Sequence, residues 1–178
     1  AQELGGDPTR AMAAPKHALQ RKLLDRELRQ PLETSLVAED GVSAASLALA
    51  FEELLGGGSA LLPLLQPHAQ RLASLIKGLT LHPVAQLLLT AAQTARPEHY
   101  AHAVAAMALN GALMAAGGGD DAAVRLALLC GLLHDVGEMY IGPEHGEAEA
   151  DRDLDFASYQ QLVVHPHVGS LLLAQLTN

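Results

Sequence analysis

Residues 120–135, with the sequence DDAAVRLALLCGLLHD, decide the fold of this chain. The stretch begins with Asp120, a residue type that caps helix N-termini, and then places apolar side chains around most of a helical circumference. A helix of this kind is normally buried on several sides. The stretch therefore predicts a central helix. It also predicts that Cys130, the single cysteine of the chain, lies in the core and is not reactive.

Prolines and glycines mark further helices on both sides of this stretch. Proline is favoured in the first turn of a helix, and glycine is favoured just after its end. No run of alternating β-branched residues predicts a strand. The predicted helices lie within residues 16–30, 41–58, 59–80, 81–95, 96–119 and 165–178. We therefore expect an all-α fold, with residues 1–80 as an N-terminal helical region and residues 81–178 as a compact helical domain.

Composition restricts the core and the binding partners. Apolar residues make up 49% of the 178 residues, but aromatic residues only 3%, so the core must consist mainly of Leu, Ala and Val. The net charge is −9, and the 11 Lys and Arg residues form no basic run. Binding to a nucleic acid duplex needs clustered positive charge, and so does binding to an anionic membrane. We expect neither partner.

The same features predict a cytoplasmic location. A single cysteine cannot form an intrachain disulfide, which fits a reducing compartment. The N-terminal residues do not resemble a signal peptide. The most apolar segment, AVAAMALNGALMAA, is interrupted by Asn110 and is too short to span a bilayer.

Four polar residues stand where predicted helices begin or end. His134 and Asp135 follow the buried leucines 132 and 133, and Gly137 permits a turn directly afterwards. His102 lies in the first turn of its helix, and His165 precedes Pro166 at the start of another. A cation is favoured at a helix C-terminus, and His134 and Asp135 can share one ion only if the helix unwinds there. From spacing alone, a metal site, a proton-transfer site and a polar helix cap all stay open.

Taken in order, His102, the segment LLHDVGEMYI and the segment HPHVG resemble the HD superfamily of metal-dependent phosphohydrolases. The HD-GYP branch, the cyclic-di-GMP phosphodiesterases of bacterial signal transduction, is the most similar. The resemblance covers residues from about 82 to 178. It implies an HD-domain-like helical bundle with an N-terminal helical extension.

The resemblance also implies a site. The metal ligands would be His102, His134, Asp135 and His165, holding one or two divalent ions of Fe, Mn, Ni or Zn. Imidazole nitrogens together with a carboxylate suit these metals. The catalytic residues would be His134 and Asp135, with Asp135 as the bridging ligand. The bound ions would activate a water that attacks a cyclic dinucleotide or another phosphoester.

Two departures from the family pattern favour an alternative. Glu138 stands where HD-GYP proteins usually have a lysine that helps hold the phosphate, and the later HHE and GYP motifs are absent from these 178 residues. A catalytically degenerate HD or HDOD-like module, which binds a signalling protein without hydrolysis, has the same fold. A homo-oligomer is a further alternative for the N-terminal helices. We assign His145, in the acidic loop 142–155, to solvent, and His82 to a helix cap or the surface.

Overall fold

The computed structural model describes residues 41–140 and 156–175. The described residues all belong to one compact unit of the chain. The predictions for residues 16–30, the acidic loop 142–155 and His145 lie outside the described residues. The described part is helical and contains no strand, which confirms the all-α prediction there. The HD-like bundle stays a prediction.

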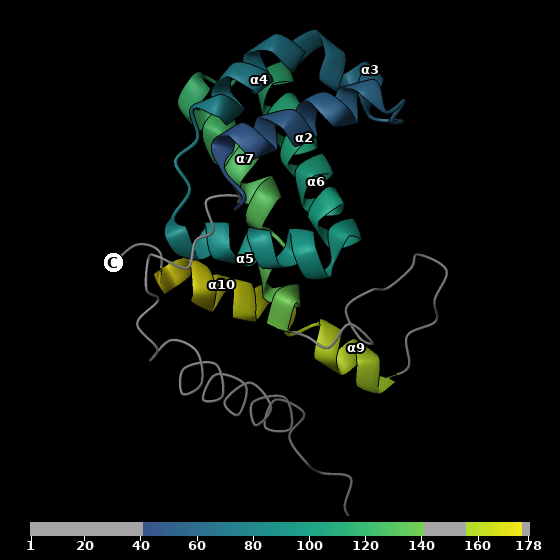
Figure 1. Cartoon of the computed structure of the whole chain (residues 1–178), viewed down its shortest axis with the longest axis vertical. Coiled ribbons are helices and arrows are strands. Elements are labelled where there is room, and N and C mark those ends of the chain that lie inside the picture. The colour runs from purple at the N-terminus through teal and green to yellow at the C-terminus, as the bar shows by residue number, and fades with distance from the viewer. Residues whose placement is uncertain (1–40, 141–155, 176–178) are drawn as a thin grey trace, which may run out of the picture. The chain divides into compact units, whose positions relative to one another are not determined.

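The described elements are all helices, of 3 to 20 residues. In chain order they are α2 (Ala44–Gly56), α3 (Leu62–Leu65), η2 (Gln66–His68), α4 (Ala69–Lys77), α5 (Pro83–Ala95), α6 (Pro97–Ala116), α7 (Asp121–Leu133), η3 (Val136–Tyr140), α9 (Phe156–Leu162) and α10 (His165–Gln175). Figure 1 shows α6 and α7 side by side, with α2 and α4 across one end and with α5, η3 and α10 at the other.

Local hydrogen bonds explain where the helices begin. Ser43 and Ser46 form a capping box at α2, in which each side chain bonds the other residue's backbone N–H. The side chain of Asp120 accepts a hydrogen bond from the Ala123 N–H at 2.8 Å. His82 caps α5 by accepting from the Val84 N–H, so it is one of the predicted cap residues. Gly118, with φ of 80°, makes the reversal that returns the chain from α6 into α7.

The antiparallel pair of α6 and α7 lies at the centre of the core. One side of α7 is buried through Val124, Leu128 and Leu132, and both α6 and α4 contact this helix. Gly131 lies so close to α6 that a β-carbon there would be 2.8 Å from the Met107 Cα. The smallest residue type is therefore found where the two helices approach most closely at this point.

The core includes residues on both sides of position 80. Phe51, Leu72 and Ile76 are fully buried in the same cluster as Met107 and Leu128. Helices α2 and α4 thus pack with α6 and α7 around one apolar interior. The predicted division between residues 80 and 81 therefore lies between segments that contribute to the same core.

The prediction that Cys130 lies in the core is wrong. Cys130 is exposed, and Leu126, also on α7, is 63% exposed. The cause is that only the side of α7 with Leu128 and Leu132 is buried in the core. An apolar surface allows a helix to be buried on several sides. The number of neighbouring helices decides how many of those sides are covered.

Tyr100 provides a test of the core. Its side chain lies in the cluster at 8% exposure, and its hydroxyl is buried without a hydrogen-bond partner. Burial, and secondarily the charge of Glu53, raises the pKa of Tyr100 above its ordinary value. We expect Tyr100→Phe to leave the free energy of unfolding unchanged or to raise it by up to about 1 kcal/mol, because a buried unpaired hydroxyl is costly.

Urea denaturation followed by circular dichroism measures this difference. The matched control is Tyr159→Phe on α9, where the side chain is 53% exposed and the change should be within about 0.5 kcal/mol. A loss of more than about 1 kcal/mol in Tyr100→Phe would contradict the prediction, since it would mean that the hydroxyl is satisfied in solution.

Candidate metal centre

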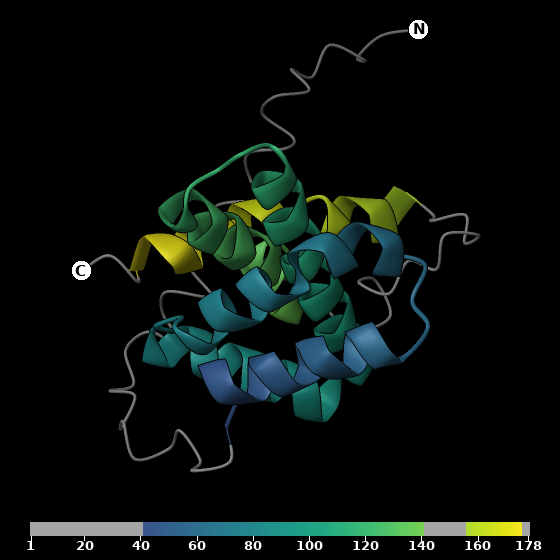
Figure 2. The ribbon, with the colours of Figure 1, turned by 90° about the horizontal axis from the view of Figure 1, so that it is seen from above.

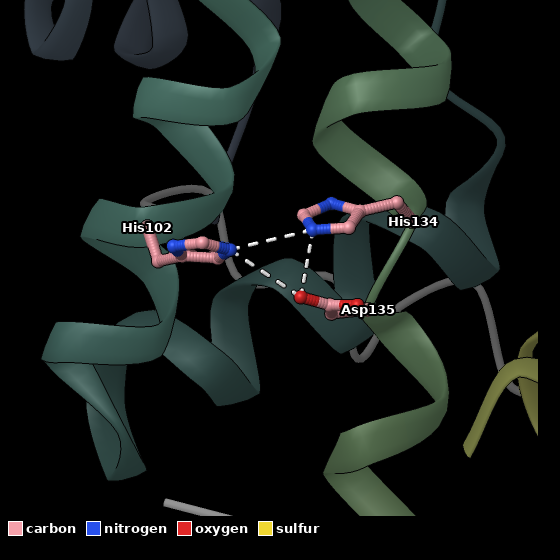
Figure 3. Close-up of side chains that lie close together, drawn as sticks. All are labelled: His102, His134 and Asp135. Carbon is pink, nitrogen blue, oxygen red and sulfur yellow. Dashed lines mark hydrogen bonds and ion pairs between the residues drawn. The ribbon is translucent and has the colours of Figure 1, made fainter. Parts of the chain in front are cut away.

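His134 and Asp135 lie where the chain changes from α-helix to 3-10 helix. α7 ends at Leu133, His134 is its C-cap residue, and η3 begins at Val136. The Glu138 N–H donates to the Asp135 carbonyl at 2.8 Å, a bond of the 3-10 type. The helix therefore unwinds at the predicted position. This change of helix type lets two consecutive side chains point toward the same space (Figure 3).

The first group of side chains comes from α6 and the end of α7. His134 Nε2 lies 2.7 Å from Asp135 Oδ2, and His102 Nε2 lies 3.4 Å from the same oxygen (Figure 3). The two imidazole Nε2 atoms are 3.3 Å apart. The side chains of His102 and His134 are 59% and 40% exposed, whereas that of Asp135 is 18% exposed. Asp135 is thus the more buried member of the group, whereas the two imidazoles are open to solvent.

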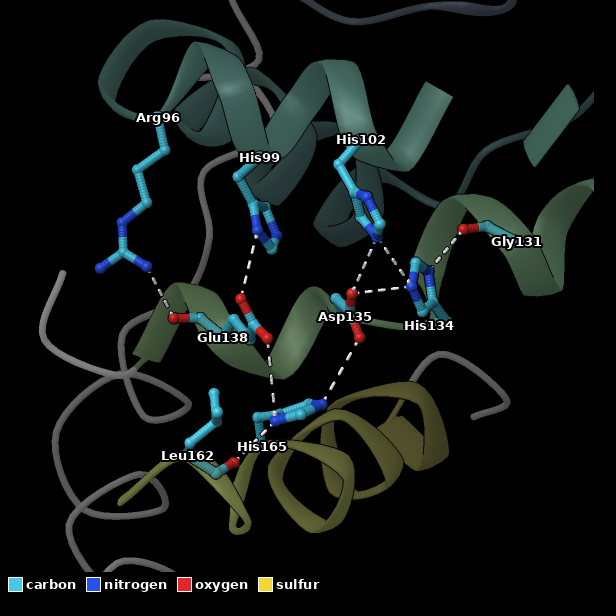
Figure 4. A network of polar contacts seen from close by, with 9 residues as sticks. All are labelled: Arg96, His99, His102, Gly131, His134, Asp135, Glu138, Leu162 and His165. Atoms are coloured by element: carbon cyan, nitrogen blue, oxygen red, sulfur yellow. Dashed lines mark hydrogen bonds and ion pairs between the residues drawn. The ribbon is translucent and has the colours of Figure 1, made fainter. Parts of the chain in front are cut away.

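The second group joins η3 to the start of α10. His165 Nε2 lies 3.4 Å from Asp135 Oδ1, the oxygen that does not face His102 (Figure 4). Ligand atoms of Asp135, Glu138 and His165 lie within 4.8 Å of one another, as do those of His102, His134 and Asp135. Asp135 therefore belongs to both groups. Either group could hold a metal ion.

Two backbone carbonyls orient the imidazoles. His134 Nδ1 lies 2.8 Å from the Gly131 carbonyl oxygen, and His165 Nδ1 lies 2.7 Å from that of Leu162 (Figure 4). A carbonyl oxygen only accepts, so each Nδ1 donates its proton. Nε2 is then the nitrogen that faces Asp135 and that could bind an ion.

Glu138 lies between two histidines and carries a negative charge. Its Oε2 is 3.4 Å from His99 Nδ1, and its Oε1 is 3.8 Å from His165 Nδ1 (Figure 4). Burial raises the pKa of the Glu138 carboxyl, but the hydrogen bond from His99 and the charges of His165, His99 and His102 together lower it below the ordinary value of 4.5. Glu138 is therefore a carboxylate at neutral pH. Arg96 donates to the main-chain carbonyl of Glu138 at 2.9 Å.

Gly137 allows α10 to approach the end of α7. A β-carbon at Gly137 would overlap the carbonyl oxygen of His165 and would lie 2.7 Å from the Gly169 nitrogen. The sequence indicates Gly137 as a residue that permits a turn, but its φ is not positive, so close approach is what requires glycine here. Figures 1 and 2 show α9 and α10 extending in opposite directions from the turn at 163–164, which places His165 at their junction.

The donor atoms of the first group are spaced so that they could hold one metal ion. Two ligand atoms bound at about 2.1 Å lie about 3.0 Å apart on an octahedron and about 3.4 Å apart on a tetrahedron. The contacts of His102 Nε2, at 3.3 and 3.4 Å, match these spacings, and the 2.7 Å contact between His134 Nε2 and Asp135 Oδ2 would lengthen around a bound ion. Two imidazoles with one carboxylate are borderline ligands that suit Zn, Fe, Mn or Ni.

The structure brings the four predicted ligands, His102, His134, Asp135 and His165, to one place. They form two groups around Asp135 rather than one set of four. Sequence reasoning missed the pairing of His99 with Glu138 and the two carbonyls that orient the imidazoles. The sequence did contain one signal for Glu138. It lies three residues after Asp135, and this spacing aligns two side chains on a 3-10 turn.

No family model matches the chain, and no curated protein or solved structure matches it. Among the described helices, none combines the length and the apolar character needed to cross a bilayer.

Proposed function

We propose that the chain is a divalent-metal-dependent phosphohydrolase that cleaves a phosphodiester. The observation that carries this proposal is the convergence of His102, His134, Asp135 and His165 from three separate elements. They are also the residues on which the resemblance to the HD superfamily rests.

The chemistry would be divided between the ion and the side chains. A bound ion would supply an activated water and would offset the charge of the phosphate oxygens. His102, His134 and Asp135 would hold it, and the Gly131 carbonyl keeps His134 in the binding tautomer. The exposed edges of His102 and His134 leave room for a phosphodiester to reach the site from solvent.

The substrate class follows from the motif pattern. The order His102, His-Asp, His-Pro resembles that of the cyclic-di-GMP phosphodiesterases, so we propose a cyclic dinucleotide as the substrate. The Asp135 and Glu138 carboxylates would repel an anionic substrate unless cations occupy the site. Hydrolysis should therefore depend strictly on added metal.

One observation favours a second candidate, a degenerate signalling module that binds a partner without hydrolysis. The Glu138 carboxylate stands at the position where a phosphate-holding lysine would be expected. A carboxylate there weakens substrate binding when the ions are absent. This candidate predicts the same fold and a weakly occupied site without turnover.

Metal analysis combined with a phosphodiesterase assay tests both candidates. We expect the purified chain to hold at least one Mn²⁺ per molecule and to hydrolyse bis(p-nitrophenyl) phosphate and cyclic-di-GMP. In His102→Ala the affinity for Mn²⁺ should fall by about 100-fold or more, because a ligand is lost. The control is His68→Ala in η2, which should retain both properties.

The outcomes separate the candidates. Bound metal without turnover on either substrate would favour the signalling module. Absence of both metal and turnover would contradict both the metal site and the phosphohydrolase, and would leave the polar residues as helix caps.

A further inference from the structure

Arg96 lies in the corner between α5 and α6, and its side chain reaches the segment that carries Asp135. We infer that Arg96 is a positioning residue, which holds η3 against the start of α6 and thereby sets the distance between His102 and Asp135. The inference rests on the proposed function, because this distance matters only if the first group binds an ion. It assigns a determinant of metal affinity outside the ligand set.

The main chain of Arg96 is held by both helices. Arg96 is the C-cap residue of α5 and the N-cap residue of α6. Its N–H donates to the Ala92 carbonyl at 2.8 Å, and its carbonyl accepts from the Tyr100 N–H at 3.1 Å. The side chain therefore starts from a fixed base, so the group that it binds is held at a set distance from α6.

The guanidinium of Arg96 reaches across to η3. Arg96 Nη1 donates to the Glu138 carbonyl at 2.9 Å, although 42 residues separate the two in the chain (Figure 4). The Glu138 N–H in turn donates to the Asp135 carbonyl at 2.8 Å. His99, in the first turn of α6, adds a second link through its 3.4 Å contact with the Glu138 carboxylate. The Arg96–Glu138 bond thus holds the 3-10 turn that begins at Asp135.

The packing of η3 differs between its two sides. Toward α10 the contact is close, since a β-carbon at Gly137 would overlap the His165 carbonyl oxygen. Toward α5 and α6 a small, mainly apolar pocket remains, lined by residues that include Leu88, Ala103 and Met139. Apolar side chains that face a gap lose part of their attractive contacts. Polar bonds are therefore needed to keep η3 at its distance from α6.

The two sides of η3 carry different candidate ligands. His165 belongs to α10 and is coupled to η3 by the close contact at Gly137, whereas His102 belongs to α6, on the side of the pocket. His102 Nε2 lies 3.4 Å from Asp135 Oδ2, a spacing that fits one bound ion. A displacement of η3 away from α6 would lengthen this distance first. The Arg96–Glu138 bond opposes that displacement.

Hydrogen exchange of the metal-free chain tests this bond by itself. In Arg96→Ala the amides of η3 should exchange about fivefold faster, the factor expected from the loss of one hydrogen bond. The matched control is Arg71→Ala on α4. Arg71 Nη2 also donates to a distant main-chain carbonyl, that of Gly119 at 2.8 Å, but beyond the opposite end of α6. This control should leave the exchange of η3 at the wild-type rate.

Equilibrium dialysis with Mn²⁺ tests the effect on the first group. Arg96→Ala should weaken binding by about tenfold, as is typical when a group that supports metal ligands is removed. Arg96→Lys should restore the affinity to within about threefold of wild type, because an ammonium N–H can donate to the same carbonyl. Arg96→Met keeps an apolar stem without a donor and should bind as weakly as Arg96→Ala. Arg71→Ala should bind as the wild type does, and circular dichroism checks the fold of each variant.

The outcomes separate this inference from the proposed function. Wild-type exchange and wild-type Mn²⁺ affinity in Arg96→Ala would overturn the positioning role and leave the phosphohydrolase standing. Equal weakening in Arg96→Lys and Arg96→Met would also overturn it, since donation to the Glu138 carbonyl would then not matter. Faster exchange in Arg96→Ala, with no Mn²⁺ bound by the wild type, would overturn the metal site while supporting the role of Arg96 in holding η3.

Discussion

Gly131→Ala is expected to lower the free energy of unfolding by about 3–5 kcal/mol. A β-carbon at this position would overlap the carbonyl oxygen of Ala106 and would lie 2.7 Å from its carbonyl carbon. These are backbone atoms of α6, which cannot rotate away as a side chain can. Relief requires α6 and α7 to separate, and that separation opens the core around Met107 and Leu128.

The same substitution should also weaken metal binding. Gly131 accepts the hydrogen bond of His134 Nδ1, and His102 lies one turn before Ala106 on α6. Moving the helices apart separates the Nε2 atoms of the two histidines, which are now 3.3 Å apart. The variant that damages the core therefore also damages the first group.

Urea denaturation of metal-free protein measures the loss of stability. The control is Gly56→Ala at the exposed end of α2, where a β-carbon would meet nothing within 4 Å. It should leave stability unchanged or raise it by about 0.4–1 kcal/mol, since alanine restricts the unfolded chain. A change of less than about 1 kcal/mol in Gly131→Ala would be incompatible with the close packing of α6 and α7.

Asp135→Asn is expected to abolish metal binding and to lower phosphodiesterase activity by about 10²–10³-fold or more. Asp135 is the residue shared by the two groups of ligands. An amide is neutral, and its nitrogen presents N–H groups to one of the two sets of imidazoles.

Thermal unfolding with and without Mn²⁺ gives a readout independent of activity. An ion at 100 times its dissociation constant stabilises the wild type by about 2.7 kcal/mol, and Asp135→Asn should lack this increment. The control is Asp121→Asn, the same change near the start of α7. That residue pairs with Arg71 at 2.8 Å on the exposed surface and should leave metal binding intact. An Mn²⁺ response of normal size in Asp135→Asn would contradict the central role of this carboxylate.

Helix positions were predictable from the sequence because their causes are local. The Asp120 side chain bonds an N–H three residues away, and Pro83 and Pro97 begin their helices by their fixed φ. The candidate ligands were predictable for a related reason. A histidine and an aspartate next to buried leucines are costly unless they have a partner, so His134 and Asp135 stand out in any apolar helix.

The arrangement of the site depends on contacts between residues far apart in the chain. Whether Cys130 is buried depends on which sides of α7 have neighbours, and the helical period of the sequence does not contain that information. The division of the ligands into two groups depends on the approach of α10 to Gly137, and the lowered pKa of Glu138 depends on His99 and His165. Periodicity and capping act over one helical turn, whereas the candidate ligand atoms come from separate elements whose spacing is set by the packing of the whole core.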